Sequence, residues 1–413
     1  MHRKILFLSS ANLTTNPRLL KELKYAAELG YEVDFVGFDL NTWSDEIDKE
    51  INKNIPAEFT YLPVTRKSPV NWLLSSFAER FSKKTAFLFK KSVKIHAFAH
   101  SKRSWLLSRQ LKACRKKYDL IAAHTLPALY PAYRLARRQN IPFVFDIEDY
   151  HPGVQAGEAA ADKNEINRRE FLMKKLLPEA NFLTYASPLI GKESLQLLID
   201  YPKNKHRLIN NCFSQSEFQF TESRSEKVKF VWFSQNIAAG RGLELVIPAL
   251  YRFKDKVELH LIGNLYQNFY EEYLAHYSDI LKIHKPMPQK ELNLKLSEFD
   301  VGLAVEPGKD FNNKIALSNK IWAYYQSGLY VLATDTRAQK QFIEENNNMG
   351  IIAKQNSDDF STKTENIISN IKQIRENKEK RFEYAENFSW EVESEKLIDI
   401  WSKVLSQSNL IVP

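Results

Sequence analysis

Three consecutive polar residues, Ser318, Asn319 and Lys320, open a short predicted helix in the second half of the chain. Small polar side chains are favoured where a helix starts, and the free backbone N–H groups there attract anions. Arg241 lies in the glycine-containing turn NIAAGRG, and Lys314 lies four residues before Ser318. These cations and amides together predict a site for a negatively charged group.

A second group of titratable side chains follows the predicted strand PFVFDI. Glu148, Asp149 and His151 lie within four residues of one another, at a strand end, where open α/β sheets place their ligands. A carboxylate there could orient a hydroxyl group or accept a proton, although Asp149 could also simply cap a turn. His124, which ends the preceding predicted strand YDLIAAH, is either a further candidate or a structural histidine.

Hydroxyl and amide groups follow the first predicted strand, at Thr14, Thr15 and Asn16. These groups could contact the hydroxyls of a substrate. Asn16 followed by Pro17 also predicts the start of a helix, because asparagine caps the free N–H groups and proline lacks an N–H of its own. Capping alone would explain Asn16.

Strands and helices that could position these residues alternate along the chain. KILFLSS, RLLKELKYAAEL and YEVDFVGF predict a strand, a helix and a strand, the unit of a parallel sheet. The alternation restarts at KFVWFSQ, after the polar stretch SQSEFQFTESRSEK. We therefore predict an α/β protein with a first domain of residues 1–217, a second of residues 218–389 and a final helical segment of residues 390–413.

Length and composition agree with two folded domains. A chain of 413 residues exceeds one ordinary core. The two cysteines, Cys114 and Cys212, are too few and too far apart for a disulfide framework or a zinc site. The N-terminal apolar run is shorter than a secretory signal, and no run approaches the ~20 residues that span a bilayer, so we expect a cytoplasmic protein.

Motif searches exclude two common α/β classes. Neither half carries G-x-G-x-x-G after its first strand, which argues against a dinucleotide enzyme, and the chain has no P-loop.

In order and spacing the segments resemble GT-B glycosyltransferases of the family 4 kind. The resemblance spans about residues 4–339 and is carried by TTNPRLLKELKYAAELGYEV, IPFVFDIEDYHP, GRGLELVIPAL, VELHLIG, KPMPQKELNLKLSEFDVGLAV and SNKIWAYYQSGLYVLATD. It implies two Rossmann-like domains facing across a cleft, a nucleotide-diphosphate sugar held mainly by the second and an acceptor met by the first. It also implies a last helix that returns to the first domain, retention of configuration, and no metal or other cofactor.

This resemblance gives each candidate residue a role. A departing nucleotide diphosphate gains charge, and an enzyme without a metal must stabilise it with cations and N–H groups. The donor-binding candidates are Arg241, Lys314, Ser318, Asn319, Lys320 and Glu306. The catalytic candidates are Glu148, Asp149 and His124, and the acceptor-binding candidates are Thr14, Thr15, Asn16 and His151.

The sequence departs from the family pattern in the second half. Ile315 and Ala323 occupy the places of two glutamates that lie eight positions apart in the family. Glu306 is a nearby carboxylate that could replace one of them in binding ribose, or it could simply end a strand. Ser234–Gln235 replaces a glycine-arginine pair, which leaves more of the phosphate contacts to Arg241.

Positive charge concentrates in residues 66–117, where 15 Lys and Arg face a single acid, Glu79. Aromatic and aliphatic residues such as Trp72, Phe77 and Phe81 recur there at helical spacing. An apolar face beside lysines suits an anionic membrane surface, which predicts peripheral binding at the inner face of the membrane. In the other interpretation, the aromatics pack in the first domain and the lysines are solvated. No nucleic-acid-binding module accompanies the charge, so we expect no nucleic acid partner.

The sequence therefore predicts a glycosyltransferase that moves a sugar from a nucleotide-diphosphate sugar to a hydroxyl of a growing glycan or lipid-linked acceptor. Two other interpretations stay open. One is a sugar-nucleotide epimerase with the same fold. The other is a non-catalytic glycan- or nucleotide-binding protein, which Ile315 and Ala323 favour because no glutamate stands at those positions.

Overall fold

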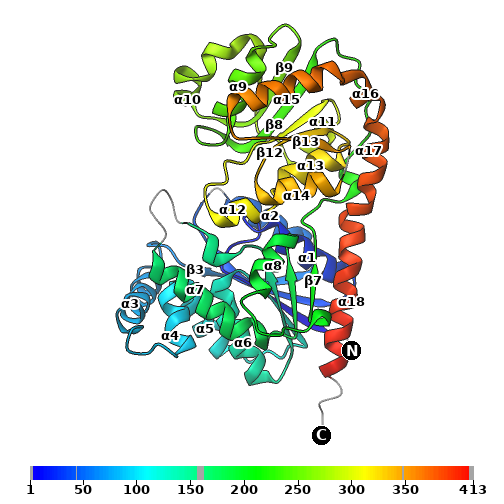
Figure 1. The fold of residues 1–413 in the computed structure, drawn as a ribbon. Coiled ribbons are helices and arrows are strands. Elements are labelled where there is room, and N and C mark those ends of the chain that lie inside the picture. Colours follow the sequence, from blue (N-terminus) through cyan, green and yellow to red (C-terminus); the bar gives the residue numbers. More distant parts are fainter. Residues whose placement is uncertain (1–2, 43, 156–161, 347, 409–413) are drawn as a thin grey trace. The chain divides into compact units, whose positions relative to one another are not determined.

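The computed structural model of the chain, drawn in Figure 1, describes residues 3–42, 44–155, 162–346 and 348–408. The contacts between its residues divide the chain into two compact units. Unit 1 consists of Met1–Ile209 together with Ser394–Pro413, and unit 2 consists of Asn210–Glu393. Within the described residues, no helix is both long and apolar enough to span a membrane.

A seven-stranded parallel sheet forms the centre of unit 1, with the order β3-β2-β1-β4-β5-β6-β7. The strands are β1 Lys4–Ser9, β2 Glu32–Asp39, β3 Ala57–Pro63, β4 Leu120–His124, β5 Phe143–Ile147, β6 Phe182–Tyr185 and β7 His206–Leu208. Chain order reverses between β1 and β4. In open α/β sheets, ligands bind beyond the carboxyl ends of the strands at such a reversal.

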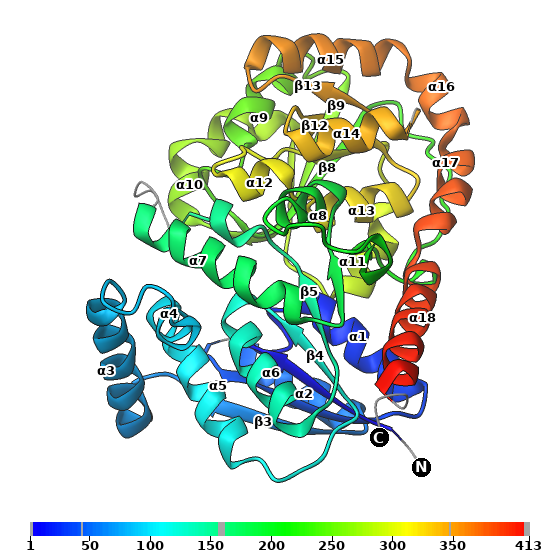
Figure 2. The same ribbon diagram turned by 60° about the horizontal axis from the view of Figure 1, so that its bottom comes forward.

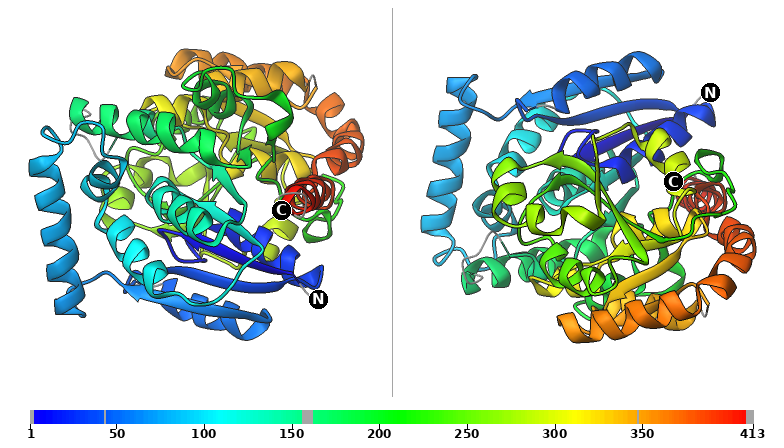
Figure 3. Two further views of the ribbon diagram at one scale, coloured as in Figure 1. Left: turned by 90° about the horizontal axis from the view of Figure 1, so that it is seen from below. Right: turned by 90° about the horizontal axis from the view of Figure 1, so that it is seen from above.

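Helices connect the strands of unit 1. They are α1 Pro17–Glu28, α2 Ser44–Asn54, α3 Pro69–Thr85, α4 Val93–His100, α5 Lys102–Ala113, α6 Leu126–Gln139, α7 Lys163–Leu176 and α8 Pro188–Leu195. Asn16 starts α1 as predicted, since its Oδ1 accepts a hydrogen bond of 3.0 Å from the Leu19 N–H. The three helices between β3 and β4 lie side by side (Figure 2), and α3 stands at the periphery of the unit in both views of Figure 3.

A six-stranded parallel sheet forms the centre of unit 2, with the order β10-β9-β8-β11-β12-β13. The strands are β8 Val228–Ile237, β9 Val257–Leu265, β10 Leu281–His284, β11 Val301–Ala304, β12 Tyr330–Thr334 and β13 Gly350–Ala353. Here the order reverses between β8 and β11. Both sheets thus confirm the predicted fold class, an α/β protein with two Rossmann-like domains.

The helices of unit 2 cover both faces of its sheet. They are α9 Leu243–Tyr251, α10 Gln267–Glu272, α11 Gln289–Leu296, α12 Phe311–Ile315, α13 Asn319–Gln326, α14 Arg337–Glu345, α15 Ser357–Ser369, α16 Ile371–Glu376 and α17 Lys378–Ala385. Two tryptophans, Trp232 of β8 and Trp322 of α13, are fully buried between these layers. The core therefore fixes β8, which precedes the donor candidates, and α13, whose first two residues are the donor candidates Asn319 and Lys320.

The last helix, α18 (Trp390–Ser408), continues from unit 2 into unit 1 at Ser394. Within unit 1 its Trp401 is buried and contacts the rings of three residues, Phe7, Tyr25 and Tyr31, at centroid distances of 6.3, 6.5 and 6.1 Å. Residues 409–413 of the segment predicted as 390–413 lie outside the described residues.

A buried ion pair attaches α16 to the sheet of unit 2. Asp300, just before β11, is fully buried, and Arg375 donates from Nε and Nη2 to its two carboxylate oxygens at 2.9 Å each. Burial alone would raise the pKa of Asp300, but the hydrogen bonds from Arg375 and the Lys229 N–H lower it. The carboxylate is therefore ionised, and its charge depends on Arg375 for compensation.

Removing the cation of this pair destabilises unit 2. In Arg375→Gln, the buried charge of Asp300 loses its partner, which costs about 3 kcal/mol of unfolding free energy. The measurement is the urea midpoint at neutral pH. The control is Arg224→Gln, because Arg224 pairs with Glu222 at the surface, where the side chains are 85% and 66% exposed, and we expect its midpoint to be unchanged. Equal midpoints for the two variants would contradict this interpretation.

Candidate functional site

A cluster of charged side chains lies at the carboxyl ends of β1, β4 and β5, where chain order reverses in unit 1. The strand register explains the position: His124 of β4 pairs with Ser9 of β1 on one side and with Asp146 of β5 on the other. Arg18 of α1 donates from Nε and Nη2 to the two oxygens of Asp146 at 2.6 and 2.8 Å. Arg18 and Asp146 are each 3% exposed, so this is a buried, two-pronged ion pair.

His124 is the positive centre of this cluster. Its Nδ1 lies 2.8 Å from Glu148 Oε1, and its Nε2 lies 3.4 Å from Glu22 Oε2. Burial alone would lower the pKa of His124, but Glu22, Glu148 and Asp146 outweigh it and raise this pKa to about 10. The imidazole is thus protonated at neutral pH, and both of its nitrogens are donors.

Glu148 is the carboxylate of the cluster that reaches solvent. Its Oε1 accepts hydrogen bonds from Asn16 Nδ2 at 2.7 Å and from His124 Nδ1 at 2.8 Å. The side chain of Glu148 is 20% exposed, whereas those of Glu22 and Asp146 are 4% and 3% exposed. Two donors from different elements therefore fix a carboxylate that a substrate can contact.

Three of the predicted residues, Asn16, His124 and Glu148, come together in this network. The hydroxyls of the neighbouring candidates face other partners: Thr14 donates to Asp48 at 2.6 Å, and Thr15 donates to Asn12. Their predicted contact with an acceptor stays a prediction.

The other two candidates of this region follow Glu148. Asp149 is half-buried. His151 begins a short 3-10 turn, His151–Gly153. Burial, together with the nearby charges of His100 and Arg169, lowers the pKa of His151 to about 3, so its ring is neutral. Its Nε2 is buried and has no hydrogen-bond partner among the described residues. The catalytic role of Asp149 and the acceptor-binding role of His151 stay predictions.

Three of the clustered groups have the spacing of a metal site. Glu22, His124 and Asp146 offer ligand atoms that all lie within 4.8 Å of one another. However, a metal ion there would have to displace the proton of His124, which Glu22, Glu148 and Asp146 stabilise. Arg18 also bonds both oxygens of Asp146 and supplies the compensating positive charge. We therefore interpret the cluster as an ion-pair network that positions Glu148.

Sequence reasoning missed Arg18, Glu22 and Asp146. A signal was present, because Arg18 and Glu22 are four residues apart on the face of α1 that also buries Leu19 and Leu23. Charged residues at the apolar positions of an amphipathic helix are rarely buried unless they are paired. Their partners, however, come from β4 and β5, more than a hundred residues away.

Unit 2 has a pocket of about 160 Å³ at its own reversal of strand order. The loop after β8 and the loop after β11 form it with α12 and the first turn of α13. The residues that line it are Gly240, Arg241, Glu306, Pro307, Gly308, Lys309, Asn313 and Lys320. We call it the unit 2 pocket. Three of the donor candidates, Arg241, Glu306 and Lys320, share it.

The charges of the unit 2 pocket are unequally paired. Lys320 Nζ donates to Glu306 Oε1 at 2.8 Å, and it also lies 6.0 Å from the centre of the buried Trp232 ring. The side chain of Arg241 forms one hydrogen bond among the described residues, to Ser234 Oγ at 3.5 Å. Neither Arg241 nor Lys309 forms an ion pair with an acid in the described parts of the chain, so two positive charges at the pocket are uncompensated.

Backbone geometry brings the Arg241 turn close to the loop after β11. Gly242 adopts φ 87°, and a Cβ on it would lie 3.2 Å from both Cβ and O of Val305. Only glycine accommodates this approach. The glycines that looked like turn residues in the sequence thus also hold Arg241 against the loop that carries Glu306 and Lys309.

The remaining donor candidates surround α13. Ser318 precedes the helix, and its Oγ is buried without a hydrogen-bond partner among the described residues. Asn319 Oδ1 accepts a hydrogen bond of 2.7 Å from Asn211. Lys314 is exposed beside Gly308 and is not one of the residues that line the pocket. Their donor-binding roles stay predictions.

The departures from the family pattern also have a structural counterpart. Ile315 and Ala323 are fully buried, and Ala323 belongs to an apolar core cluster, so a glutamate at either place would require different packing. Sequence reasoning missed Lys309 and Asn313, although the segment EPGKDFNNK combines a turn with cations and amides after a predicted strand.

Replacing His124 tests the ion-pair network through its pH dependence. The pKa of an unfolded histidine is about 6.5, against about 10 for folded His124. The stabilisation from this raised pKa is full below pH 6.5 and is lost as the pH rises through 10. Between pH 7 and 10 we expect the unfolding free energy of the native chain to fall by on the order of a few kcal/mol more than that of His124→Gln.

Urea denaturation at a series of pH values measures this difference. His151→Gln is the control, because the lowered pKa of His151 affects stability only between about pH 3 and 6.5, where the unfolded chain binds the extra proton. Its alkaline slope therefore matches that of the native chain. Identical alkaline slopes for the native chain and His124→Gln would show that the buried imidazole is not protonated.

Known proteins resemble this chain in structure and not in sequence. No model of a known protein family matches the sequence, and no curated protein matches it. HepE from Anabaena in complex with UDP-glucose matches 97% of this chain and 100% of its own, with a TM-score of 0.65 at 14% identity. Sucrose-phosphate synthase from Thermosynechococcus elongatus matches 98% of this chain and 100% of its own, with a TM-score of 0.66 at 13% identity.

Two further solved structures bear on the choice between functions. The lipopolysaccharide outer core galactosyltransferase WaaB, in its apo form, matches 97% of this chain and 99% of its own, with a TM-score of 0.60 at 13% identity. A UDP-N-acetylglucosamine 2-epimerase matches 93% of this chain and 91% of its own, with a TM-score of 0.53 at 10% identity. Such identities establish a fold and no substrate: this chain has the GT-B fold of glycosyltransferases.

Proposed function

We propose that this protein is a glycosyltransferase that moves a sugar from a nucleotide-diphosphate sugar to a hydroxyl of a glycan or lipid-linked acceptor. The unit 2 pocket carries the proposal. It lies at the reversal of strand order, and its Arg241 and Lys309 have no acidic partner among the described residues. The likeness to HepE, whose solved structures contain UDP and UDP-glucose, supports a nucleotide sugar as the ligand.

The pocket suits a leaving group whose charge increases during the reaction. When the bond between the sugar and the diphosphate breaks, negative charge develops on the diphosphate oxygen. Cations that are already in place stabilise that charge without reorganisation, and no metal ion is then required. Arg241 and Lys309 are the candidates for this task. Lys320, held by Glu306, is a third cation, and the free oxygen of Glu306 could accept a hydrogen bond from a ribose hydroxyl.

Glu148 is the candidate that contacts the reacting sugar or the acceptor. Its carboxylate is fixed by Asn16 and His124 and is partly exposed. In a transfer with retention of configuration, the acceptor hydroxyl attacks from the side that the diphosphate leaves. The departing diphosphate oxygen takes the hydroxyl proton, so one C–O bond forms, another breaks and charge balances. Glu148 would orient a hydroxyl in this step by accepting its hydrogen bond.

An epimerase is the competing function, because an epimerase shares this fold. The two reactions differ in their need for an acceptor. An epimerase converts a nucleotide sugar when it is incubated alone, whereas a transferase leaves the sugar unchanged or releases it slowly to water. A new nucleotide sugar appearing without an acceptor would overturn the proposed transfer.

We also propose that unit 1 associates with the anionic inner face of a membrane, as expected for a lipid-linked acceptor. Helix α3 supports this, because it buries its serines Ser75 and Ser82 and exposes its large apolar side chains. Leu73, Phe77 and Phe81 are 58%, 69% and 57% exposed. The interpretation in which these aromatics pack in the domain therefore does not describe Phe77 and Phe81. Exposed apolar patches of this kind mark interaction surfaces.

Neutralising the unit 2 pocket weakens nucleotide binding. UDP-, GDP-, ADP- and CMP-sugars are screened by thermal shift in the presence of a chelator, because a ligand that binds only the folded chain raises its melting temperature. For the sugar nucleotide with the largest shift, we expect the Kd of Arg241→Gln/Lys309→Gln to rise at least about tenfold, since each lost cation removes a charge-assisted hydrogen bond to phosphate.

Arg252→Gln/Lys256→Gln is the matched control, because these cations also lie on unit 2 but do not line the pocket. It loses the same net charge and keeps the native Kd. If both variants weaken binding equally, or neither does, the pocket is not the diphosphate site.

Replacing Glu148 separates chemistry from donor binding. Glu148→Gln keeps the size of the side chain and removes its charge, so we expect kcat for release of the sugar to fall about a hundredfold, a typical loss when a reacting hydroxyl is no longer correctly oriented. The nucleotide thermal shift stays as in the native chain. Glu170→Gln, which removes a surface carboxylate paired with Lys174, leaves kcat unchanged. A native kcat in Glu148→Gln would exclude Glu148 from the reaction.

A further inference from the structure

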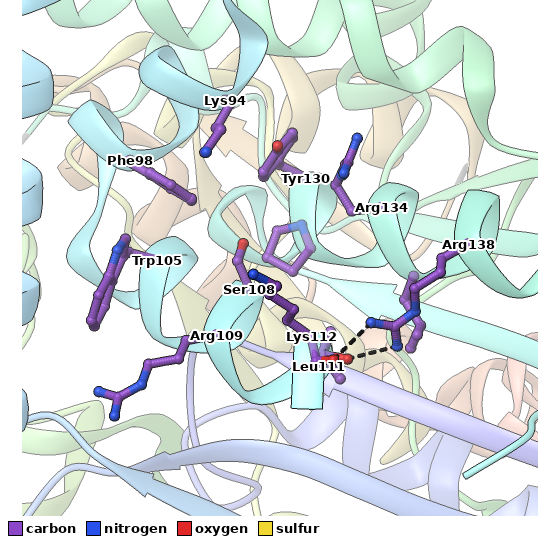
Figure 4. Close-up of a pocket in the computed structure, with 12 residues that line it drawn as sticks. Lys94, Phe98, Trp105, Ser108, Arg109, Leu111, Lys112, Tyr130, Arg134 and Arg138 are labelled. Atoms are coloured by element: carbon purple, nitrogen blue, oxygen red, sulfur yellow. Dashed lines mark hydrogen bonds between the residues drawn. The ribbon is translucent and has the colours of Figure 1, made fainter. Parts of the chain in front are cut away.

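A pocket of about 480 Å³ opens on the helical face of unit 1, between α4, α5 and α6 (Figure 4). Its residues are Lys94 and Phe98 from α4, Trp105, Ser108, Arg109, Leu111 and Lys112 from α5, and Tyr130, Pro131, Arg134, Leu135 and Arg138 from α6. We call it the basic pocket. It contains five cations and no acidic residue.

Most of this positive charge has no acidic partner among the described residues. Arg138 donates to the backbone oxygens of Leu111, Lys112 and Cys114, so it serves to close the end of α5 (Figure 4). The other four cations are Lys94, Arg109, Lys112 and Arg134, all exposed. None of them forms an ion pair with any acid in the described ranges. Like charges that lie close together in a concave surface repel one another, and a bound anionic ligand relieves this repulsion.

Aromatic rings hold two of these cations at the pocket. Lys94 Nζ lies 5.9 Å from the centre of the Phe98 ring, and the Arg109 guanidinium lies 5.6 Å from the Trp105 ring. Phe98 itself packs edge to face on Tyr130, at 5.8 Å. Figure 4 shows the ammonium of Lys94 directed into the space between Phe98 and Tyr130. The pocket therefore has an aromatic wall that carries positively charged groups at its mouth.

The basic pocket is separate from the charged cluster around His124. That cluster lies at the carboxyl end of β4. Helix α6 follows β4 and runs back along the sheet, so its lining residues, Tyr130 to Arg138, lie progressively nearer the opposite edge. A ligand in the basic pocket thus does not take the place of a substrate at Glu148.

The exposed apolar helix α3 adjoins this pocket. It packs against both α4 and α5, and Arg109 Nη1 of the pocket lies 3.5 Å from Asn71 Oδ1 of α3. The segment after α3 exposes three more large apolar side chains, Phe87, Leu88 and Phe89, at 67%, 65% and 51%. Unit 1 thus carries apolar groups that suit an acyl layer on a helix that packs against two of the helices forming the basic pocket, whose cations suit the phosphates above such a layer.

We propose that the basic pocket binds the phosphate group of an anionic phospholipid while α3 rests in the interface of the same leaflet. The inference relies on the membrane association proposed above and is independent of sugar transfer. Lys94, Lys112 and Arg134 surround the phosphate, Arg109 lies on the side of the pocket next to α3, and the aromatic wall contacts the glycerol and first methylenes. A free phosphate-bearing molecule shares the headgroup chemistry but gains nothing from the exposed side chains of α3.

Vesicle flotation of the full chain tests this site. The vesicles are phosphatidylcholine, alone or with about a third phosphatidylglycerol, so that the surface is neutral or anionic. The native chain binds the anionic vesicles. Lys94→Gln/Arg134→Gln binds them about thirtyfold more weakly, as expected when two cations at the surface are lost. Lys117→Gln/Arg137→Gln removes the same net charge from the same region of unit 1, outside the pocket, and changes binding less than about threefold.

Three other outcomes would each contradict the proposed phospholipid site. Equal losses in the two double variants indicate a diffuse electrostatic attraction without a site. A thermal shift of the native chain with inorganic phosphate, lost in Lys94→Gln/Arg134→Gln, together with no vesicle binding, assigns the pocket to a free ligand. If the native chain binds neither vesicles nor phosphate, both the pocket and the membrane association fail.

The thermal-shift screen with nucleotide sugars tests the proposed sugar transfer independently of the basic pocket. Lys94→Gln/Arg134→Gln alters no residue of the unit 2 pocket, so it retains the native thermal shift with the sugar nucleotide. That retained shift also shows that the variant is folded. If the native chain binds vesicles but shows no thermal shift with any nucleotide sugar, the basic pocket is supported and the proposed transferase is refuted.

Discussion

Uncompensated positive charge at the carboxyl edge of the unit 2 sheet is the interaction on which the proposed function depends. Two loops meet there, and the left-handed glycine Gly242 lets them approach closely enough to share a pocket. Arg241 and Lys309 are left without acidic partners among the described residues, while Lys320 is held by Glu306. A fold of this class provides the edge, but the side chains decide whether it binds an anion.

The charged cluster around His124 in unit 1 uses charge in the opposite way. Its cations are compensated: Arg18 bonds both oxygens of Asp146, and protonated His124 lies between Glu22 and Glu148. This compensation gives Glu148 its role, since a partly exposed carboxylate with two fixed donors on one oxygen has a defined orientation. The network therefore holds Glu148 in place as a hydrogen-bond acceptor, whereas the unit 2 pocket holds cations in place as hydrogen-bond donors.

The sequence predicted those features that depend on local pattern. The strand-helix alternation gave two parallel sheets, because buried strands and amphipathic helices have distinct periods. Asn16 before Pro17 predicted the start of α1, and NIAAGRG predicted the turn that carries Arg241. The order of weak motifs pointed to the GT-B fold, which the structural likeness confirms.

Pairings between distant residues could not be predicted in this way. Asp146 and Arg18 are 128 residues apart, and only the register of β5 beside β4 makes them neighbours. Nor did the sequence indicate that Lys320 and Glu306, both named as donor ligands, would bond to each other. For Phe77 and Phe81, spacing showed that they share a helix face, but only the packing of α3 shows that this face is exposed.

Calorimetric titration of the native chain with UDP and with uridine, each in the presence of a chelator, tests metal-free recognition of a diphosphate most directly. If the cations of unit 2 hold the diphosphate, UDP binds at least about a hundredfold more tightly than uridine, and the chelator changes neither affinity. The same titration with GDP and ADP covers a different base preference. Diphosphates that bind no more tightly than their nucleosides, or only when a divalent ion is added, would contradict the proposed role of Arg241 and Lys309.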